Sequence, residues 1–416
     1  MEILSTGEKI KRARVYKGIT LKELCEDKIS ISKMSCIENG KVKPERWIIE
    51  IVAEKLDLDI EYLLQDVREQ IENNLEFSLK NEKSRDFEDE LEMYLSYAKD
   101  YEYYDLAFDI MHKIFRFYIK QGRFDKVQNI ITEYYELYQK YPNGAENYFK
   151  DMASYFYKNK EYVESITYFN RLKEALGKKL TKELECELLF GESICYNRLG
   201  YTDQSYSKIL EAMEYSKDID DSILKGKILS AIAGFSIGLN KIEQGEMYKE
   251  EANELLKDTS KALAYAKESY GENYFKVGKR EIAIREIREA IGMFPKEEGD
   301  IYGDFLNKCI WLFVENNELD LSQHYVETAL NVAIGCNNIK LIERAYYIKG
   351  LILQKRGMFL QSEMYMNLSM DALLKFGSKD QKYKRYLEMA NMYHKLEEIR
   401  EALKYFTLAL NIEKQL

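Results

Sequence analysis

Residues 271–290 read GENYFKVGKREIAIREIREA, and this stretch contains the central part of a repeat unit. Tyr274 lies on the N-terminal side of the polar turn KVGKR, and Ala283 and Ala290 follow the turn seven residues apart. Apolar residues on both sides of a polar turn, at spacings that return to one helix face, are typical of two amphipathic helices. The stretch therefore predicts a helical hairpin with a short loop.

The same spacing recurs along the chain at intervals of 38 to 40 residues. A small or aliphatic residue marks each unit: Val127, Ser165, Ser205, Gly245, Ala283, Ser322, Ser362 and Ala402. A mostly large residue lies nine positions before each: Tyr118, Phe156, Tyr196, Ser236, Tyr274, Phe313, Leu353 and Tyr393. One hairpin cannot bury its own apolar face, so adjacent hairpins are expected to stack.

This pattern resembles the tetratricopeptide repeat, most closely in residues 271–290 and 390–409. Residues 231–252 match it least, and the first unit, near residues 115–134, is degenerate. The interval exceeds the usual repeat of about 34 residues, which predicts longer helices or loops. The resemblance implies an all-α protein, with a right-handed α-solenoid of about eight helical hairpins over residues 91–416.

A second pattern, ITLKELCEDKISISKMSCIENGKVKP, occupies residues 19–44. Thr20 is a good N-cap for a short helix, and Glu23 completes a capping box. Ser30 or Ser32 is expected to cap the next helix. Gly40 ends that helix, because glycine adopts the left-handed conformation at little cost. The pattern predicts two short helices separated by a tight turn.

The second of these helices has an apolar side and a polar side. Met34 and Ile37 are expected to point inward, which leaves Ser32, Lys33 and Cys36 on the outer face. Pro44 suits the first turn of a further helix. An opening helix over residues 8–14 and later apolar residues complete a small core: Ile10, Ala13, Ile48, Ile51, Val52, Leu56, Leu63 and Leu64.

This order of residues resembles the Xre/lambda-repressor class of helix-turn-helix domains. The matching residues are Ile10, Arg14, Gly18, Thr20, Leu24, Ser30, Ser35, Ile37, Glu38, Gly40, Pro44, Ala53, Leu56, Leu63 and Leu64. Two features depart from the class. Leu21 stands where glutamine is usual, and the turn before Ser30 is one residue shorter and lacks its glycine.

The resemblance implies a DNA-binding domain over residues 1–66, whose second motif helix enters the major groove. Ser32 and Lys33 would contact base edges, with Cys36 on the flank and Lys33 suited to guanine. The remaining predicted DNA-binding residues, most of them placed to meet phosphates, are Thr20, Lys22, Ser30, Lys41 and Lys43.

Charge divides unevenly along the chain, which carries a formal net charge of −10. Residues 1–46 contain eleven Lys or Arg against seven Asp or Glu, whereas residues 67–416 contain fifty against fifty-nine. Attraction to DNA must therefore come from the N-terminal residues. Between the two parts, residues 67–90 are polar and predict a linker helix with Ile71, Leu75 and Leu79 on one face.

The sequence contains no recognised catalytic or metal-binding pattern. Six cysteines lack paired spacing, and three histidines (His112, His324 and His394) are isolated, so free thiols in a reducing compartment are expected. Phosphate-binding, metalloprotease and nucleophile-elbow motifs are absent. No signal peptide or membrane-spanning run is apparent. We expect a cytoplasmic protein that is not an enzyme and needs no cofactor or metal.

A helix-turn-helix pattern followed by tetratricopeptide-like repeats resembles the RRNPP family of peptide-pheromone receptors, which includes the Rap, Rgg, NprR, PlcR and PrgX proteins. Its NprR and PlcR branches are the most similar. The family implies a homodimeric quorum-sensing transcriptional regulator that binds palindromic promoter DNA. A short signalling peptide would bind the concave groove and shift the population of two conformers.

The first helix of each hairpin would line the groove in such repeats. Aligning the units on their small residues predicts these peptide-binding residues: Asn197, Glu272, Asn307, Trp311, Tyr347, Gln354, Asn391 and His394. Asparagine and glutamine can bind a peptide backbone as donor and acceptor, and Trp311 can cover an apolar side chain.

Three other interpretations remain open. The repeats can bind a protein such as a response regulator, as in the Rap branch, which makes DNA binding secondary. The chain can be a phage-encoded lysis–lysogeny receptor of the same architecture. It can also be a scaffold or chaperone adaptor whose N-terminal helices are vestigial, which predicts no sequence-specific DNA binding.

Overall fold

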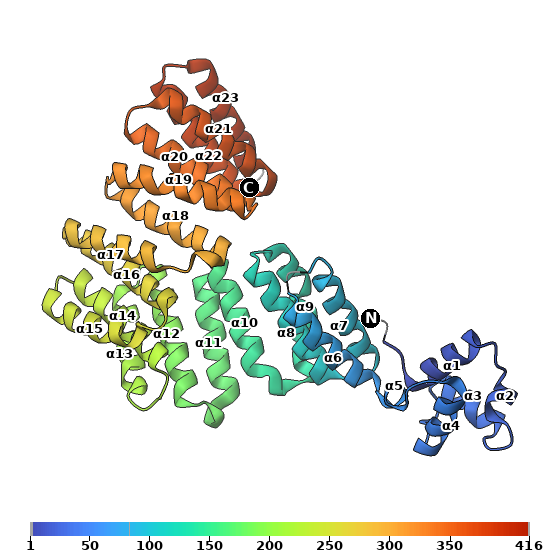
Figure 1. The fold of residues 1–416 in the computed structure, drawn as a ribbon. Coiled ribbons are helices and arrows are strands. Elements are labelled where there is room, and N and C mark those ends of the chain that lie inside the picture. The colour runs from blue at the N-terminus through green and yellow to red at the C-terminus, as the bar shows by residue number, and fades with distance from the viewer. Residues whose placement is uncertain (1–2, 83, 415–416) are drawn as a thin grey trace. The chain divides into compact units, whose positions relative to one another are not determined.

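The computed structural model describes residues 3–82 and 84–414, in which every regular element is a helix (Figure 1). The chain divides into two compact units. The first contains residues 1–180 and 194–201, and the second contains residues 181–193 and 202–416. Helix α12, Lys182–Arg198, contributes residues to both units. The predicted all-α class is confirmed.

The first unit begins with five helices around one small core. They are α1 (Thr6–Tyr16), α2 (Leu21–Cys25), α3 (Ile31–Glu38), α4 (Arg46–Leu56) and α5 (Ile60–Leu64). The predicted apolar residues form this core, with Met34, Ile37 and Leu63 buried and Ala13, Ile51 and Leu64 partly buried. One prediction is wrong: α4 begins at Arg46, so Pro44 precedes the helix instead of occupying its first turn.

The rest of the first unit continues with longer helices. They are α6 (Val67–Lys80), α7 (Phe87–Asp100), α8 (Tyr104–Lys120), α9 (Phe124–Lys140), α10 (Ala145–Lys158) and α11 (Tyr162–Leu176), with 3-10 turns η1 (Pro142–Gly144) and η2 (Gly177–Lys179). In α6, Ile71 and Leu75 are buried as expected, but Leu79 is 39% exposed. The apolar face of this helix therefore ends one turn earlier than its sequence indicates.

The second unit is a series of helical pairs. Its helices after α12 are α13 (Thr202–Ser216), α14 (Ser222–Gly238), α15 (Ile242–Leu256), α16 (Ser260–Lys276), α17 (Arg280–Met293), α18 (Gly299–Glu315), α19 (Leu319–Gly335), α20 (Ile339–Lys355), α21 (Phe359–Phe376), α22 (Lys379–Lys395) and α23 (Ile399–Glu413), with 3-10 turn η3 (Lys296–Glu298). Sequential pairs such as α14 with α15 and α20 with α21 pack against each other. The long helices account for the interval of 38 to 40 residues.

The small residues that mark the repeat all occupy one position, the fourth residue of the second helix of a pair, and all are buried. Three serines there donate to a carbonyl twelve residues earlier, on the first helix. Ser165 donates to Ala153 at 2.9 Å, Ser205 to Ser193 at 2.7 Å and Ser362 to Gly350 at 2.9 Å. A small residue is needed because the two helices cross closely at this point.

The turns within the pairs share one backbone feature. The residue two positions before each second helix has a positive φ: Gly122, Lys160, Gly200, Asn240, Gly278, Asn317, Gly357 and Glu397. This left-handed residue ends the first helix and redirects the chain into the second. The turn therefore repeats even where glycine is replaced. No described helix combines the length and apolarity needed to cross a membrane.

Candidate nucleic-acid interface and groove pocket

The predicted caps of α2 and α3 form as hydrogen bonds. The Thr20 backbone amide donates to the Glu23 carboxylate at 2.7 Å, and the Glu23 amide donates to the Thr20 hydroxyl at 3.2 Å. Ser30, not Ser32, caps α3, because the Lys33 amide donates to the Ser30 hydroxyl at 3.2 Å. Ser32 consequently lies exposed in the first turn of α3.

The turn between the two helices lacks glycine and uses a glutamate in its place. Glu26 follows α2 with φ of 45°, a conformation that L-residues rarely adopt. Its carboxylate lies 2.5 Å from the Lys55 ammonium of α4. The Lys55 side chain also donates to the Glu23 carbonyl at 2.5 Å. Lys55 thus connects the turn between α2 and α3 to α4.

A buried ion pair joins α3 to α1. Arg14 donates to Glu38 through Nε at 2.6 Å and through Nη2 at 2.9 Å, and its Nη1 donates to the Ile19 carbonyl at 2.9 Å. Glu38 is only 4% exposed. The hydrogen bonds to Glu38 raise the pKa of Arg14. A bidentate pair of this kind restricts both the position and the rotation of α3.

Lys33, the predicted base-contacting cation, is held by its own chain. Its ammonium lies 2.9 Å from the Glu45 carboxylate, which also accepts a hydrogen bond from Trp47 Nε1 at 2.6 Å. The bond from Lys33 and the bond from Trp47 lower the pKa of Glu45. Lys33 must leave Glu45 before it can reach a base, and Cys36 lies partly exposed on the same outer face.

The other predicted DNA-binding residues lie at the surface. Thr20, Lys22, Lys41 and Lys43 are exposed. Within the described part of the chain, none of these three lysines forms an ion pair. Their ammonium groups are therefore available to phosphates, unlike that of Lys33.

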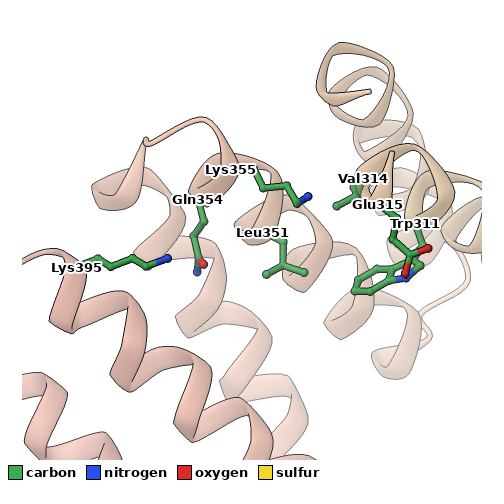
Figure 2. A pocket seen from close by; sticks show the side chains of 7 residues that line it. All are labelled: Trp311, Val314, Glu315, Leu351, Gln354, Lys355 and Lys395. Atoms are coloured by element: carbon green, nitrogen blue, oxygen red, sulfur yellow. The ribbon is translucent and has the colours of Figure 1, made fainter. Parts of the chain in front are cut away.

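The second unit contains an open pocket of about 320 Å³, which we call the groove pocket (Figure 2). Its lining residues come from the first helices of three successive pairs. They are Trp311, Val314 and Glu315 on α18, Leu351, Gln354 and Lys355 on α20, and Lys395 on α22. Two of the predicted peptide-binding residues, Trp311 and Gln354, are thus brought together.

The side chains of the groove pocket differ in how they are held. Trp311 Nε1 donates to the Glu315 carboxylate at 2.6 Å, and the Trp311 ring stacks on Tyr347 with centroids 6.3 Å apart. The Gln354 amide nitrogen is buried and has no hydrogen-bond partner among the described residues. Trp311 is therefore a fixed wall, whereas the Gln354 amide has unused hydrogen-bonding capacity.

Tyr347, a further predicted peptide-binding residue, already has partners within the protein. Its hydroxyl donates to the Glu388 carboxylate at 2.8 Å, and the Arg385 guanidinium lies 3.6 Å from the ring centroid. Burial and the Glu388 charge raise the pKa of Tyr347. Arg385 also pairs with Glu343 at 2.9 Å. Tyr347 thus supports the Trp311 ring from a polar network behind it.

The remaining predicted contacts are scattered. Asn197 on α12 and Asn391 and His394 on α22 are exposed. Glu272 on α16 is partly buried and pairs with Lys276 at 2.9 Å. Asn307 on α18 is 0% exposed, and both polar atoms of its side chain are buried without a hydrogen-bond partner among the described residues. Its role in peptide binding stays a prediction. Leu306 and Cys309 of the same helix are also 0% exposed.

Sequence reasoning missed the two lysines of the groove pocket. Lys355 follows Gln354 directly, and Lys395 follows His394, so both lie one residue beyond a predicted contact. Each is the last residue of its helix, where lysine is common for reasons unrelated to ligands. The sequence therefore contained no signal that separated them from other terminal lysines.

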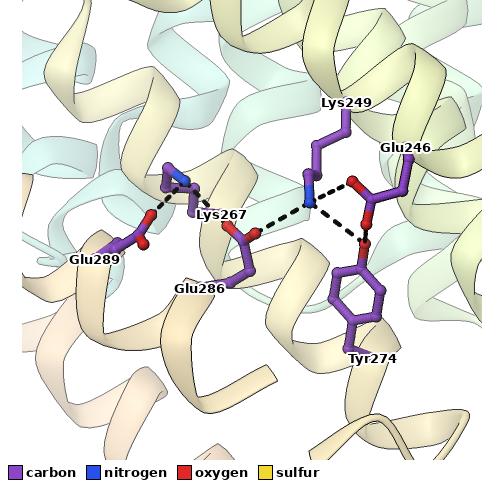
Figure 3. A network of polar contacts seen from close by, with 6 residues as sticks. All are labelled: Glu246, Lys249, Lys267, Tyr274, Glu286 and Glu289. Carbon is purple, nitrogen blue, oxygen red and sulfur yellow. Dashed lines mark hydrogen bonds and ion pairs between the residues drawn. The ribbon is translucent and has the colours of Figure 1, made fainter. Parts of the chain in front are cut away.

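A buried ionic network links α15, α16 and α17 (Figure 3). Lys249 lies at its centre, 2.7 Å from Glu246 and 3.1 Å from Glu286. Lys267 pairs with Glu286 at 3.0 Å and Glu289 at 2.7 Å. Burial alone would lower the pKa of Lys249, but Glu246 and Glu286 raise it. No sequence pattern predicted these pairs.

The sequence context of His112 suggested an isolated histidine, but the structure gives it a partner. Its Nδ1 lies 2.6 Å from the Asp151 carboxylate, which also accepts a hydrogen bond from the Tyr134 hydroxyl at 2.9 Å. The three residues join α8, α9 and α10. No group of three or more His, Cys, Asp or Glu within the described residues has an arrangement that could hold a metal ion.

Comparisons with known proteins give likenesses of fold only. No protein-family model and no curated protein matches the chain. A Rap protein complexed with Competence and Sporulation Factor is 16% identical, with 83% of this chain and 98% of that chain covered and a TM-score of 0.49. The apo quorum sensor NprR from Bacillus thuringiensis is 15% identical, with 84% and 100% covered and a TM-score of 0.49.

Aspartyl phosphate phosphatase F from Bacillus subtilis is 14% identical, with 100% of this chain and 96% of that chain covered and a TM-score of 0.42. These identities do not exceed 16%, and the TM-scores all lie below 0.5. The likeness is therefore loose and concerns the helical architecture alone.

Proposed function

We propose that this protein is a transcriptional regulator that binds promoter DNA through α2 and α3 and responds to a short peptide bound at the groove pocket. The main support for the proposal is the orientation of α3, which has a fixed inner side and a polar outer side. The Arg14–Glu38 pair fixes its inner side, while Ser32, Lys33 and Cys36 lie on its outer side next to the unpaired Lys41 and Lys43. This is the arrangement that a recognition helix requires.

The proposed DNA complex is a homodimer on a palindromic site, because one α3 reads only a few base pairs. The proposed switch is a shift between conformers, which requires that the peptide bind one of them more tightly. The groove pocket supports peptide binding because it combines an aromatic wall, an amide and cations within one opening.

The test is fluorescence anisotropy of the protein on DNA from upstream of its own gene. It is run with and without the low-molecular-weight fraction of spent culture medium. We expect specific binding whose affinity changes with the fraction, and Lys41→Glu/Lys43→Glu should abolish binding. The control is Lys178→Glu/Lys179→Glu, which reverses two exposed lysines in the repeats and should leave binding unchanged.

A second function is favoured by one observation. Lys33 is bound to Glu45, so the outer face of α3 presents less free positive charge than its sequence indicates. In this alternative the repeats bind a protein such as a response regulator, and DNA binding is secondary. A stable complex with a purified receiver domain, together with no specific DNA binding, would replace the first proposal by the second.

A further inference from the structure

We propose that the groove pocket binds the C-terminal carboxylate of a peptide whose last residue is apolar. The inference rests on the proposed function, since it states which end of the peptide the pocket takes. It follows from three properties of the pocket: its two lysines, which form no ion pair with a described residue, its unused amide and its apolar wall.

Lys355 and Lys395 supply the positive charge of the groove pocket. Neither Lys355 nor Lys395 forms an ion pair with any residue that the structure describes, and neither donates a hydrogen bond there; the Lys395 ammonium lies 5.9 Å from the Phe359 ring centroid. Other lysines of the second unit, among them Lys249, Lys267 and Lys349, are paired with glutamates. Glu315 is the only carboxylate in the lining, and it accepts a hydrogen bond from Trp311. The lining therefore carries an excess of positive charge that favours an anion.

Lys395 and the Gln354 amide, unlike Lys355, point toward the same part of the pocket. Figure 2 shows the Lys395 amine pointing from α22 toward the Gln354 amide, while Lys355 reaches over the pocket toward Val314. The Gln354 amide nitrogen is buried without a partner, and rotation about its last side-chain bond would offer it to a ligand. A carboxylate between Lys395 and Gln354 would accept bonds from both.

The apolar wall identifies what is attached to that carboxylate. In Figure 2, Leu351 lies between Gln354 and the Trp311 ring, and Val314 lies near the end of Lys355. A C-terminal residue carries its carboxylate and its side chain on the same carbon. An apolar last residue would therefore place its carboxylate at Lys395 and its side chain against Leu351 and Trp311. An internal Asp or Glu offers the carboxylate without an apolar group beside it.

The experiment uses Trp311 as its own reporter. The chain has two tryptophans, Trp47 and Trp311, so Trp47→Phe leaves Trp311 as the sole source of tryptophan emission. The probes are pools of random heptapeptides that end in Leu or Phe, one with a free carboxylate and one with a C-terminal amide. A third amidated pool carries an internal Glu. Each pool is titrated into the full-length Trp47→Phe protein.

We expect the free-acid pool to bind at least tenfold more tightly than the amide pool. Lys395→Met should remove this difference and leave the affinity of the amide pool unchanged. The matched control, Lys279→Met, changes an exposed lysine in the turn before α17 and should preserve the difference.

Each other outcome overturns the inference in a distinguishable way. Equal binding of the acid and amide pools removes the carboxylate contact but leaves peptide binding intact. Tight binding of the internal-Glu pool assigns the pocket to an acidic side chain. If no pool binds, peptide binding at the groove pocket fails, and the proposed function loses its switch along with this inference.

Discussion

At the scale of single residues, the Arg14–Glu38 pair gives the sharpest prediction. Arg14→Met leaves the Glu38 carboxylate buried without its cation, and we expect a loss of about 3–5 kcal/mol of unfolding free energy. Urea unfolding is followed by Trp47 emission in a Trp311→Phe background, since Trp47 lies on the outer side of α4, one of the five helices around this core.

The control is the double variant Arg14→Met/Glu38→Met, in which no charge is left buried. Its stability should lie much closer to that of the parent than the single variant does, because apolar residues often replace a buried pair at little cost. If the single and double variants lose equal stability, packing and not charge explains the effect.

The turn before each second helix gives a residue-scale prediction of opposite sign. Lys160 and Glu397 have φ of 66° and 61°, where a side chain is strained. Lys160→Gly should raise the unfolding free energy by up to about 1 kcal/mol, less the entropy that glycine loses on folding. Gly278→Ala, at φ of 72°, is the converse variant and should lower it. Thermal unfolding of the two variants must move in opposite directions from the parent.

Residue identity alone reveals the local hydrogen bonds but not the long-range ones. The Thr20–Glu23 capping box was predictable because both partners lie within one turn of helix. Lys33–Glu45 and Arg14–Glu38 connect different elements, so no local rule pairs them. Predicted contact residues such as Lys33 were thus correctly placed on a face, whereas their partners were not.

At the scale of elements, helix crossings set the limit on side-chain size. A Cβ built on Gly271 of α16 would lie 2.4 Å from Ile287 Cγ1 and 3.1 Å from the Ala283 carbonyl. Gly271→Ala should therefore destabilise the second unit by about 1–3 kcal/mol through overpacking. A Cβ built on Gly292 of α17 has no atom within 4 Å. The matched variant Gly292→Ala should therefore raise the free energy of unfolding by up to about 1 kcal/mol. Chemical denaturation monitored by Trp311 emission tests both, and destabilisation by both would contradict the crossing argument.

The same crossings explain how much of the fold was predictable. Small residues at a constant interval predicted the helical pairs, because the two helices of each pair approach closely at the same position of the second helix. The interval does not say which neighbouring face is groove and which is core. Asn307 was assigned to the groove from its register alone, and the structure leaves it 0% exposed.

The ionic contacts between elements add a pH dependence. Glu88 on α7 pairs with Arg123 at 2.6 Å and accepts a hydrogen bond from Tyr118 at 2.8 Å. Hydrogen bonding from Arg123 is the main cause that lowers the pKa of Glu88 to about 2. A carboxyl whose pKa is lower in the folded state stabilises fully above its unfolded value, near 4.5, and the effect disappears as the pH falls toward 2.

Glu88→Gln should therefore be destabilising at pH 7 by up to about 3 kcal/mol, from about 1.4 kcal/mol for each unit of pKa. The difference in unfolding free energy between variant and parent should become smaller as the pH is lowered below 4.5. Urea unfolding at pH 7, 4.5 and 3.5 measures it. Glu76→Gln, an exposed member of a pair within α6, is the control and should show a gap close to zero at every pH. A constant gap for Glu88→Gln would exclude the ionic explanation.

At the scale of the whole molecule, charge segregation restricts the proposed DNA binding to the N-terminal helices. The N-terminal 46 residues have four more basic than acidic residues, eleven against seven, whereas residues 67–416 have nine more acidic than basic residues, fifty-nine against fifty. This division was visible in the sequence because charge counts need no structure. The availability of each charge was not visible, since Lys33 is paired, whereas Lys22, Lys41 and Lys43 form no ion pair with any described residue.

The salt dependence of the proposed DNA binding would measure how many of these charges contact phosphates. Each phosphate contact contributes about 0.9 to the slope of log affinity against log salt concentration. Lys22→Gln/Lys41→Gln/Lys43→Gln should therefore reduce the slope by about 2.7 per protomer, that is, three times about 0.9. Anisotropy titrations on operator DNA at several salt concentrations give the slope. The control, Lys178→Gln/Lys179→Gln/Lys279→Gln, removes the same charge from exposed sites of the repeats and should leave the slope unchanged. An equal reduction by both variants would mean that net charge, and not phosphate contact through the N-terminal helices, controls binding.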